Sequence, residues 1–228
     1  MANTIGTLNE KPLHAALKQW YAEPEDRIEA PVDGFTVDIV RGDLLIEIQT
    51  RNLSVIKRKL RKLAENHRVL LIYPIARETW ILRQSKRNSR TVGRRKSPRR
   101  GSMDSVFDEF VSIAPLLSHP NFSFQVVFIQ EEQVRHFHKT GNWRRRGWRT
   151  SERRLLKVLN HRLFETPEDM LSFLPESLPS RFTTSDLAEA TSRPVWLAQK
   201  MVYCLRTMGA VGAVGKRSRW ILYERTRG

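Results

Sequence analysis

The sequence contains almost no cysteine and no long hydrophobic run. Cys204 is the single cysteine among 228 residues, which excludes an internal disulfide framework and a zinc site built from several cysteines. No segment approaches the roughly 18 uninterrupted apolar residues of a membrane-spanning helix, and the first residues lack the apolar core of a signal peptide. We therefore expect a soluble, cytoplasmic protein of prokaryotic type with no membrane partner.

Acidic residues are scarce relative to basic ones. The chain has 40 Lys and Arg against 24 Asp and Glu, a net charge of +16 and a pI near 10.7. Basic groups set against phosphates release condensed counterions, so this balance predicts a polyanionic partner. DNA is the expected partner and RNA the alternative. A merely soluble, highly charged surface would also be basic, but clustering of the basic residues favours nucleic acid.

Two basic segments carry much of this charge. Residues 84–101 contain no acid and predict a loop or disordered arm, because they cannot bury a core. Residues 142–154 interleave Trp143 and Trp148 with arginines, which suits stacking on bases and pairing with phosphates; the alternative is a basic hinge held by tryptophan packing. We interpret this second segment as a linker. The residues predicted to bind nucleic acid in both segments are Arg94, Arg95, Lys96, Arg99, Arg100, Arg144, Arg145 and Arg146.

Residues 1–141 have the hydrophobic pattern of an α/β domain. The apolar run at 68–75 suits a central parallel strand, and the order strand, strand, helix, strand predicts a mixed sheet with a crossover helix. Helices are predicted at 9–22, 52–66 and 104–117, and strands at 34–40, 44–50, 68–75 and 122–129.

Residues 155–228 have a different texture, with short helices followed by a basic hairpin. Helices are predicted at 151–164, 183–190 and 192–208, and a hairpin with its tip at 215–218. The words TTSDLAEATSRPVWLAQKMVYCL and KRSRWILYE resemble the central helices and the wing of winged helix-turn-helix domains. The resemblance implies DNA reading by Arg193, Trp196, Gln199 and Lys200, and backbone contacts by Lys216, Arg217 and Arg219. The alternative is a protein-interaction or dimerisation module.

The stretch VDIVRGDLLIEIQT, residues 37–50, places acids in two predicted strands. Side chains alternate faces along a strand, and antiparallel pairing across the turn at 41–43 brings Asp38 close to Glu47. Two such carboxylates repel each other unless something neutralises them. A hard divalent cation, Mg²⁺ or Mn²⁺, does so with oxygen ligands and suits phosphate substrates. Alternatively, Asp38 caps a bend and Glu47 pairs with a buried arginine.

An acid at Glu10 in the first helix, Asp38 in VDIV and the Glu47-Ile48-Gln49 triplet together resemble the motif of PD-(D/E)XK, restriction-endonuclease-like nucleases over residues 8–82. The resemblance implies that Asp38 and Glu47 bind metal, that the Ile48 carbonyl can add a ligand, and that Glu10 orients metal or water. Other acids that could replace Glu10 are Glu23, Glu25 and Glu29.

The departure from the family pattern is Gln49, which stands where a lysine usually positions the attacking water. Glutamine can orient water but carries no positive charge. Lys57 or Lys59 on the following helix could supply that charge.

These observations predict a metal-dependent endodeoxyribonuclease-like protein that hydrolyses phosphodiester bonds, with a restriction-endonuclease-like core and a C-terminal winged helix directing it to DNA. The predicted catalytic residues are Glu10, Asp38, Glu47 and Gln49. Gln49 favours the alternative, a catalytically inactive DNA-binding regulator or targeting subunit. Because cutting two strands commonly needs two sites, a homodimer or a larger complex is compatible with either function.

Overall fold

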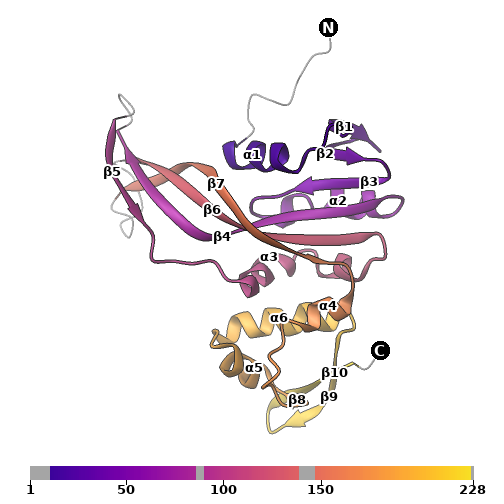
Figure 1. The fold of residues 1–228 in the computed structure, drawn as a ribbon. Coiled ribbons are helices and arrows are strands. Elements are labelled where there is room, and N and C mark those ends of the chain that lie inside the picture. The colour runs from indigo at the N-terminus through magenta and orange to yellow at the C-terminus, as the bar shows by residue number, and fades with distance from the viewer. Residues whose placement is uncertain (1–10, 86–89, 139–146, 227–228) are drawn as a thin grey trace.

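The computed structural model describes residues 11–85, 90–138 and 147–226. Within them the fold is mixed α/β, with a seven-stranded sheet and a separate three-stranded sheet (Figure 1). The large sheet contains β1 (Arg27–Val32), β2 (Phe35–Arg41), β3 (Leu44–Ile48), β4 (Arg68–Gln84), β5 (Thr91–Lys96), β6 (Phe122–Phe137) and β7 (Trp148–Phe164). The small sheet contains β8 (Arg181–Phe182), β9 (Val211–Arg217) and β10 (Trp220–Arg225).

The helices cover both faces of the large sheet and make up much of the C-terminal part. None of them, within the described residues, is long and apolar enough to cross a membrane. The α-helices are α1 (Pro12–Tyr21), α2 (Lys57–Ala64), α3 (Phe107–Phe110), α4 (Pro167–Leu171), α5 (Thr184–Thr191) and α6 (Val195–Thr207). The 3₁₀ turns are η2 (Leu53–Val55), η3 (Met103–Val106) and η4 (Ala114–Ser118).

The centre of the sheet has the predicted topology. β2 and β3 form an antiparallel hairpin whose turn holds Gly42 at φ +55°, and α2 crosses over to β4, which runs parallel to β3. The amphipathic pattern of residues 52–66 orients this crossover as expected, with Leu60 and Leu63 fully buried and Lys57 exposed. The predicted helix is interrupted, because η2 precedes α2.

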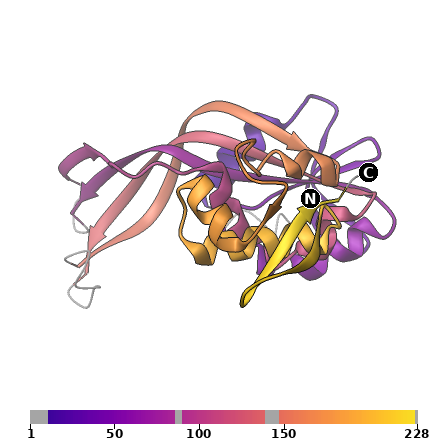
Figure 2. The same cartoon turned by 90° about the horizontal axis from the view of Figure 1, so that it is seen from below.

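Four strands continue beyond the body of the sheet and form a curved extension, which we call the arm (Figures 1 and 2). The arm consists of residues 77–84 of β4, all of β5, residues 130–137 of β6 and residues 148–155 of β7. The prediction of a structureless loop over 84–101 was wrong for β5, which pairs antiparallel with β4. Every β5 residue is exposed, so backbone pairing at the sheet edge holds this strand without a buried side chain.

Residues 148–164 overturn a second prediction. The sequence predicts a linker up to residue 154 and a helix over 151–164, but these residues form the 17-residue strand β7, antiparallel to β6. Three register shifts interrupt the pairing of β6 with β7. Such irregularities break the two-residue alternation of a strand, so the apolar residues of β7 acquire a spacing that mimics a helix.

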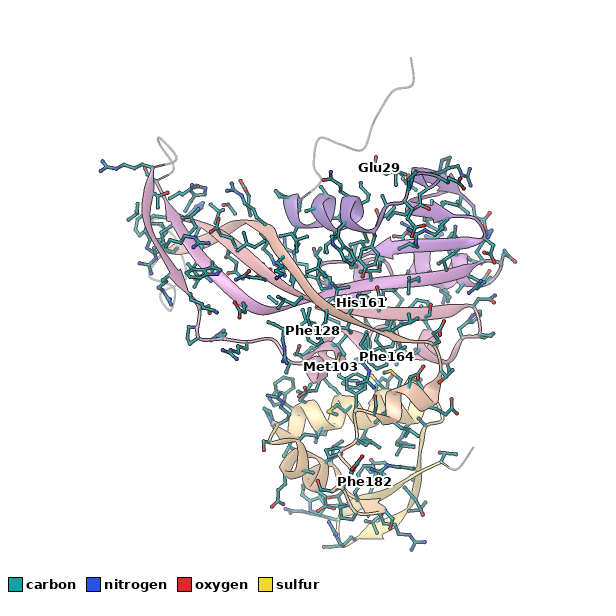
Figure 3. All side chains as sticks on the ribbon, viewed as in Figure 1. Glu29, Met103, Phe128, His161, Phe164 and Phe182 are labelled. Carbon is teal, nitrogen blue, oxygen red and sulfur yellow. The ribbon has the colours of Figure 1, made fainter. Side chains whose placement is uncertain are left out.

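The helix predicted over 104–117 is also divided, into η3, α3 and η4. It nevertheless carries the centre of a continuous core. Phe110 contacts Phe124 edge-to-face at a ring-centroid distance of 4.5 Å, and Phe124 stacks on Phe164 at 4.6 Å. The same hydrophobic cluster includes Met201 and Leu205 of α6. Figure 3 shows Phe164 where the sheet meets the C-terminal helices.

The C-terminal elements α5, α6 and the β9–β10 hairpin follow the predicted order. Thr183 and Asp186 form a reciprocal capping box at the start of α5, and Gly209, at φ +78°, follows the end of α6. The inward stripe of α6 is buried as predicted. The hairpin turn lies at residues 218–219 rather than 215–218, since β9 continues to Arg217.

Candidate active site and nucleic-acid-binding residues

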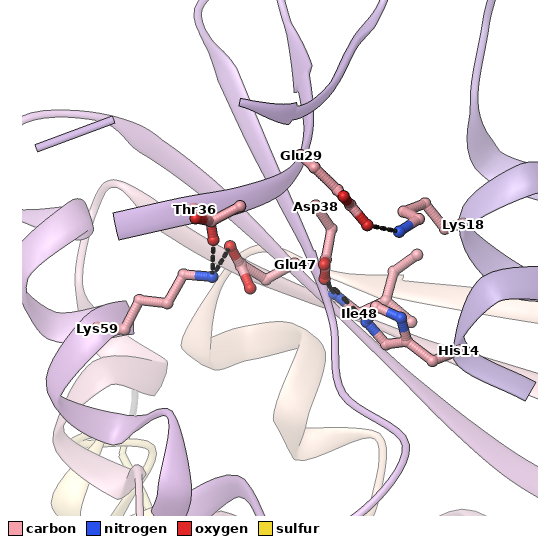
Figure 4. Close-up of polar contacts among 8 residues, drawn as sticks. All are labelled: His14, Lys18, Glu29, Thr36, Asp38, Glu47, Ile48 and Lys59. Carbon is pink, nitrogen blue, oxygen red and sulfur yellow. Dashed lines mark hydrogen bonds and ion pairs between the residues drawn. The ribbon is translucent and has the colours of Figure 1, made fainter. Parts of the chain in front are cut away.

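Asp38 and Glu47 occupy facing positions of the β2–β3 hairpin. The ladder pairs Ile39 with Ile46, and the same register carried one residue further sets Asp38 opposite Glu47. There the Asp38 carboxylate enters the ladder, because its Oδ2 accepts a hydrogen bond from the Ile48 N–H at 2.8 Å. The hairpin therefore brings the two predicted metal ligands together (Figure 4).

Helix α1 supplies a partner for Asp38 and another for a neighbouring acid, Glu29. His14 Nε2 lies 3.2 Å from Asp38 Oδ2, and Lys18, one turn later on the same helix face, donates to Glu29 Oε1 at 2.5 Å. Glu29 has φ +50°, a left-handed conformation that is costly for a residue other than glycine. The β1–β2 register sets this residue opposite Asp38, so α1, β1 and β2 converge on one cluster of charges.

Glu47 contacts a lysine from the crossover helix. Lys59 of α2 forms an ion pair with the Glu47 carboxylate and donates to the Thr36 carbonyl at 2.6 Å. Of the two lysines that the sequence offered as substitutes for the missing motif lysine, the structure therefore brings Lys59 to the acids. Gln49 instead donates from its side-chain amide to the Asn52 carbonyl at 3.2 Å.

The first-helix acid Glu10 lies outside the described residues. Among its predicted substitutes, Glu29 is close to the acidic pair, whereas Glu23 forms an ion pair with Arg41. Sequence reasoning did not assign roles to His14 and Lys18 near Asp38. The sequence pattern that could have identified these two residues is their spacing of one helical turn, on the face of α1 that also buries Leu17.

Burial and mutual charge separate the pKa values of the two acids. Glu47 is only 3% exposed, and its burial, together with the charge of Asp38, raises its pKa to about 7 despite Lys59. Burial alone would raise the pKa of Asp38 too, but His14 and the Ile48 N–H hold it below its usual value. Asp38 is thus ionised at neutral pH, while Glu47 is poised between its two protonation states.

This arrangement predicts that folding stability depends on pH through Glu47. Between its ordinary pKa of 4.5 and its folded pKa of about 7, the folded state binds more protons at this carboxyl than the unfolded state does. Stability therefore falls as pH rises through that window, by at most about 3 kcal/mol, and is constant above it. Urea unfolding of the wild type and Glu47→Gln at several pH values measures the effect. The free energy of unfolding of the variant should increase relative to that of the wild type from pH 5 to 8. A difference in free energy that stays constant over this range contradicts the assignment.

The donor set at this hairpin consists of carboxylate oxygens, with the Ile48 carbonyl as the third oxygen implied by the resemblance. Oxygen donors beside one another suit Mg²⁺ or Mn²⁺. Burial is the main cause of the raised pKa of Glu47, and the neighbouring charge of Asp38, which a cation would offset, adds to it. Over residues 11–85, 90–138 and 147–226, no three His, Cys, Asp or Glu side chains gather into a metal-binding group. Asp38 and Glu47 thus fit as two ligands of a site that needs further ones.

The basic residues predicted in the first basic segment lie on the arm and in the connection that follows it. Arg94 pairs with Glu132 at 2.8 Å and covers the Trp80 ring at 4.2 Å, and Lys96 pairs with Glu78 at 2.8 Å. Arg95 and Arg99 are exposed, and so is Arg100, whose charge helps to lower the pKa of Glu78. The predicted residues Arg144, Arg145 and Arg146 lie outside the described part of the chain.

Predicted DNA-reading residues on α6 are partly engaged within the molecule. Lys200 pairs with Asp108 of α3 at 2.8 Å, and Arg193 pairs with Asp104 of η3. Arg217 of β9 likewise pairs with Asp186 of α5. The remaining predicted side chains of this group, Trp196, Gln199, Lys216 and Arg219, are exposed. The N-terminal part of α6 thus faces the sheet domain rather than only solvent.

Comparisons with known proteins place the chain in a family. A family model described as "Domain of unknown function (DUF8091)" matches residues 11–165, which run from the start of α1 to the end of β7. An uncharacterized protein of Treponema pallidum (strain Nichols) is 31% identical over 223 residues, covering 97% of this chain and 88% of that protein. No solved structure matches the chain. Since the family model spans more than half of the sequence, the chain belongs to the DUF8091 family.

Proposed function

We propose that this protein is a DNA-binding, metal-dependent nuclease whose reaction centre is the Asp38–Glu47 pair with Lys59. The observation that carries the proposal is the meeting of two carboxylates across the β2–β3 hairpin, with a lysine from the next helix on one of them. The same three groups serve phosphodiester cleavage in the PD-(D/E)XK nucleases that the sequence resembles. Here the lysine comes from α2 instead of the position of Gln49.

Each group has a chemical task in this proposal. Asp38, held ionised by His14 and the Ile48 N–H, and Glu47 together would hold Mg²⁺ or Mn²⁺. A bound divalent cation polarises phosphoryl oxygens and lowers the pKa of a coordinated water. Lys59 supplies positive charge where negative charge develops on the phosphate, a task that preorganised donors perform efficiently in buried sites.

We further propose that residues 166–226 form a winged helix that directs the protein to DNA. The order α5, α6, β9, β10 and the small sheet β8-β10-β9 support this. Exposed Gln199 on α6, with Lys216 and Arg219 on the hairpin, offers base and phosphate contacts. Arg193 and Lys200 would have to leave Asp104 and Asp108 to join them.

The test is cleavage by the purified protein of supercoiled, linear, branched and single-stranded DNA, with Mg²⁺ or Mn²⁺ and with a chelator. We expect cleavage that needs the metal and is lost in both Asp38→Ala and Glu47→Ala. Equal activity in wild type and variants would point to a contaminating nuclease and refute the proposal. A parallel binding measurement with duplex DNA and RNA, at several salt concentrations, tests the preferred polymer.

The second candidate is a catalytically inactive DNA-binding subunit. It is favoured by Gln49, which contacts Asn52 rather than the acids, and by Lys59, whose ammonium group already neutralises Glu47. In that case the acidic pair is a structural charge cluster. Tight DNA binding without cleavage of any of the four substrates is the result expected for this function.

A further inference from the structure

A cleft of about 260 Å³ lies where the arm joins the body of the sheet. It opens between β4, β6, β7 and the connection that follows β5. The cleft combines two arginines with an apolar surface and an amide, and its lining residues are Arg77, Glu78, Arg100, Phe128, Leu159 and Asn160. Phe128 is labelled in Figure 3 at the root of the arm.

Two strand irregularities aim side chains into this cleft. The β4–β6 register shifts between Ala76 and Glu78, which leaves Arg77 as the extra residue of β4. The β6–β7 register shifts between Phe128 and Ile129, whose partners are Asn160 and Val158, so Leu159 is the extra residue of β7. Bulges redirect side chains and are frequent beside functional sites. Both extra residues here line the same cleft.

A close backbone approach places Arg100 at the cleft. The Gly101 N–H donates to the Ala76 carbonyl at 2.8 Å, and a Cβ at residue 101 would lie 2.5 Å from Ile75 Cγ2 and 2.7 Å from that carbonyl oxygen. Only glycine fits such an approach. The connection is thereby held against β4, and its preceding residue, Arg100, faces Arg77 and Glu78 across the cleft.

The charges of the cleft leave an excess of guanidinium groups. Glu78 is already bound by Lys96 at 2.8 Å and by Gln130 at 3.1 Å. Arg77 donates to the Gly101 carbonyl at 3.1 Å and lies over the Phe128 ring at 4.8 Å, which uses a minority of its five N–H donors. Guanidinium groups match the geometry of phosphate and carboxylate oxygens, and phosphate suits a site on a protein of this basic charge.

We propose that this cleft binds one nucleotide, with its phosphate on Arg77 and Arg100 and its base against exposed Leu159, near the Asn160 amide. Its volume lies just below the roughly 300–1,000 Å³ typical of drug-sized ligands, which suits a single unstacked nucleotide and excludes a duplex. If the bound nucleotide is part of a DNA strand, this inference rests on the proposed function. If it is a free nucleotide, the inference is independent of that function.

The cleft lies at some distance from the acidic pair along β4. Leu71, the register partner of Glu47, precedes Arg77 by six residues on β4. These residues span about 20 Å of extended strand. Leu71 and Ile75, the register partner of Phe128, are buried in the hydrophobic core between the two places, so the cleft is a site separate from the acidic pair.

The test is equilibrium binding in the presence of a chelator, which prevents metal-dependent cleavage. The probes are a short fluorescein-labelled oligothymidylate, followed by anisotropy, and adenosine monophosphate, followed by calorimetry. We expect Arg100→Gln and Leu159→Ala each to weaken oligothymidylate binding about tenfold. Gly101→Ala should weaken it as well, although it removes no side chain. Arg27→Gln, an exposed arginine on β1, is the matched control and should bind as wild type.

Arg100 and Leu159 are exposed, so their replacement tests the cleft without depending on the fold. Binding of adenosine monophosphate alone, weakened by Arg100→Gln, supports the cleft and identifies a free nucleotide as its ligand. The proposed nucleotide site is refuted if both variants bind both probes with wild-type affinity. It is also refuted if the wild type binds neither probe. Cleavage dependent on Asp38 and Glu47 is scored separately, so the nuclease proposal can stand when the cleft fails.

Discussion

Replacing Lys59 with methionine is expected to lower the rate of metal-dependent DNA cleavage by about 10²–10³-fold, the loss typical of removing one preorganised charge-stabilising donor. Lys59 is held on Glu47 and the Thr36 carbonyl, so its ammonium group needs no reorganisation when negative charge develops on the phosphate. Single-turnover cleavage with a saturating concentration of enzyme measures this step apart from DNA binding.

Two matched variants make this result specific. Lys57→Met removes an exposed lysine two residues earlier on α2, and Gln49→Ala removes the amide at the motif position. Both should retain the wild-type rate within a few-fold. If Gln49→Ala lowers the cleavage rate as much as Lys59→Met does, Lys59 of α2 does not replace the lysine of the family motif. Lys59→Arg, which keeps the charge, and a urea unfolding curve for each variant separate catalysis from stability.

Replacing Phe110 with alanine is expected to destabilise the protein by about 3–5 kcal/mol, the usual cost of emptying a buried phenylalanine site. Phe110 is fully buried and contacts Phe107 and Phe124 edge-to-face. Because this core continues into α6, the loss should be shared by the sheet and the C-terminal helices. Urea unfolding followed by far-ultraviolet circular dichroism and by tryptophan fluorescence should therefore give one coincident transition.

Phe137→Ala is the matched control for this experiment. Phe137 is 51% exposed near the end of the arm, where it touches Trp148. It has the same chemistry as Phe110 without the burial, so its replacement should cost about 1 kcal/mol or less. Two separated transitions in the Phe110 variant would show that the C-terminal helices fold independently of the sheet.

The elements predicted correctly are those whose signal is local. The alternation of residues 34–48 and the apolar stripe of α2 report directly which side chains are buried. The missed strands lack such signals. β1 is largely exposed and contains Pro31, which an edge strand tolerates, and β5 buries no side chain. In β7, the register shifts against β6 disguise the strand period, so its 17 residues read as a linker and a helix.

By itself, the sequence determined the excess of basic charge and the facing positions of Asp38 and Glu47, because side-chain alternation and a tight turn are properties of neighbouring residues. Only the tertiary structure decided which lysine reaches Glu47, that His14 supports Asp38, and that Arg193 and Lys200 meet Asp104 and Asp108. These contacts join residues far apart in the chain. Their geometry depends on how α1, α2 and α6 pack on the sheet, which no local pattern encodes.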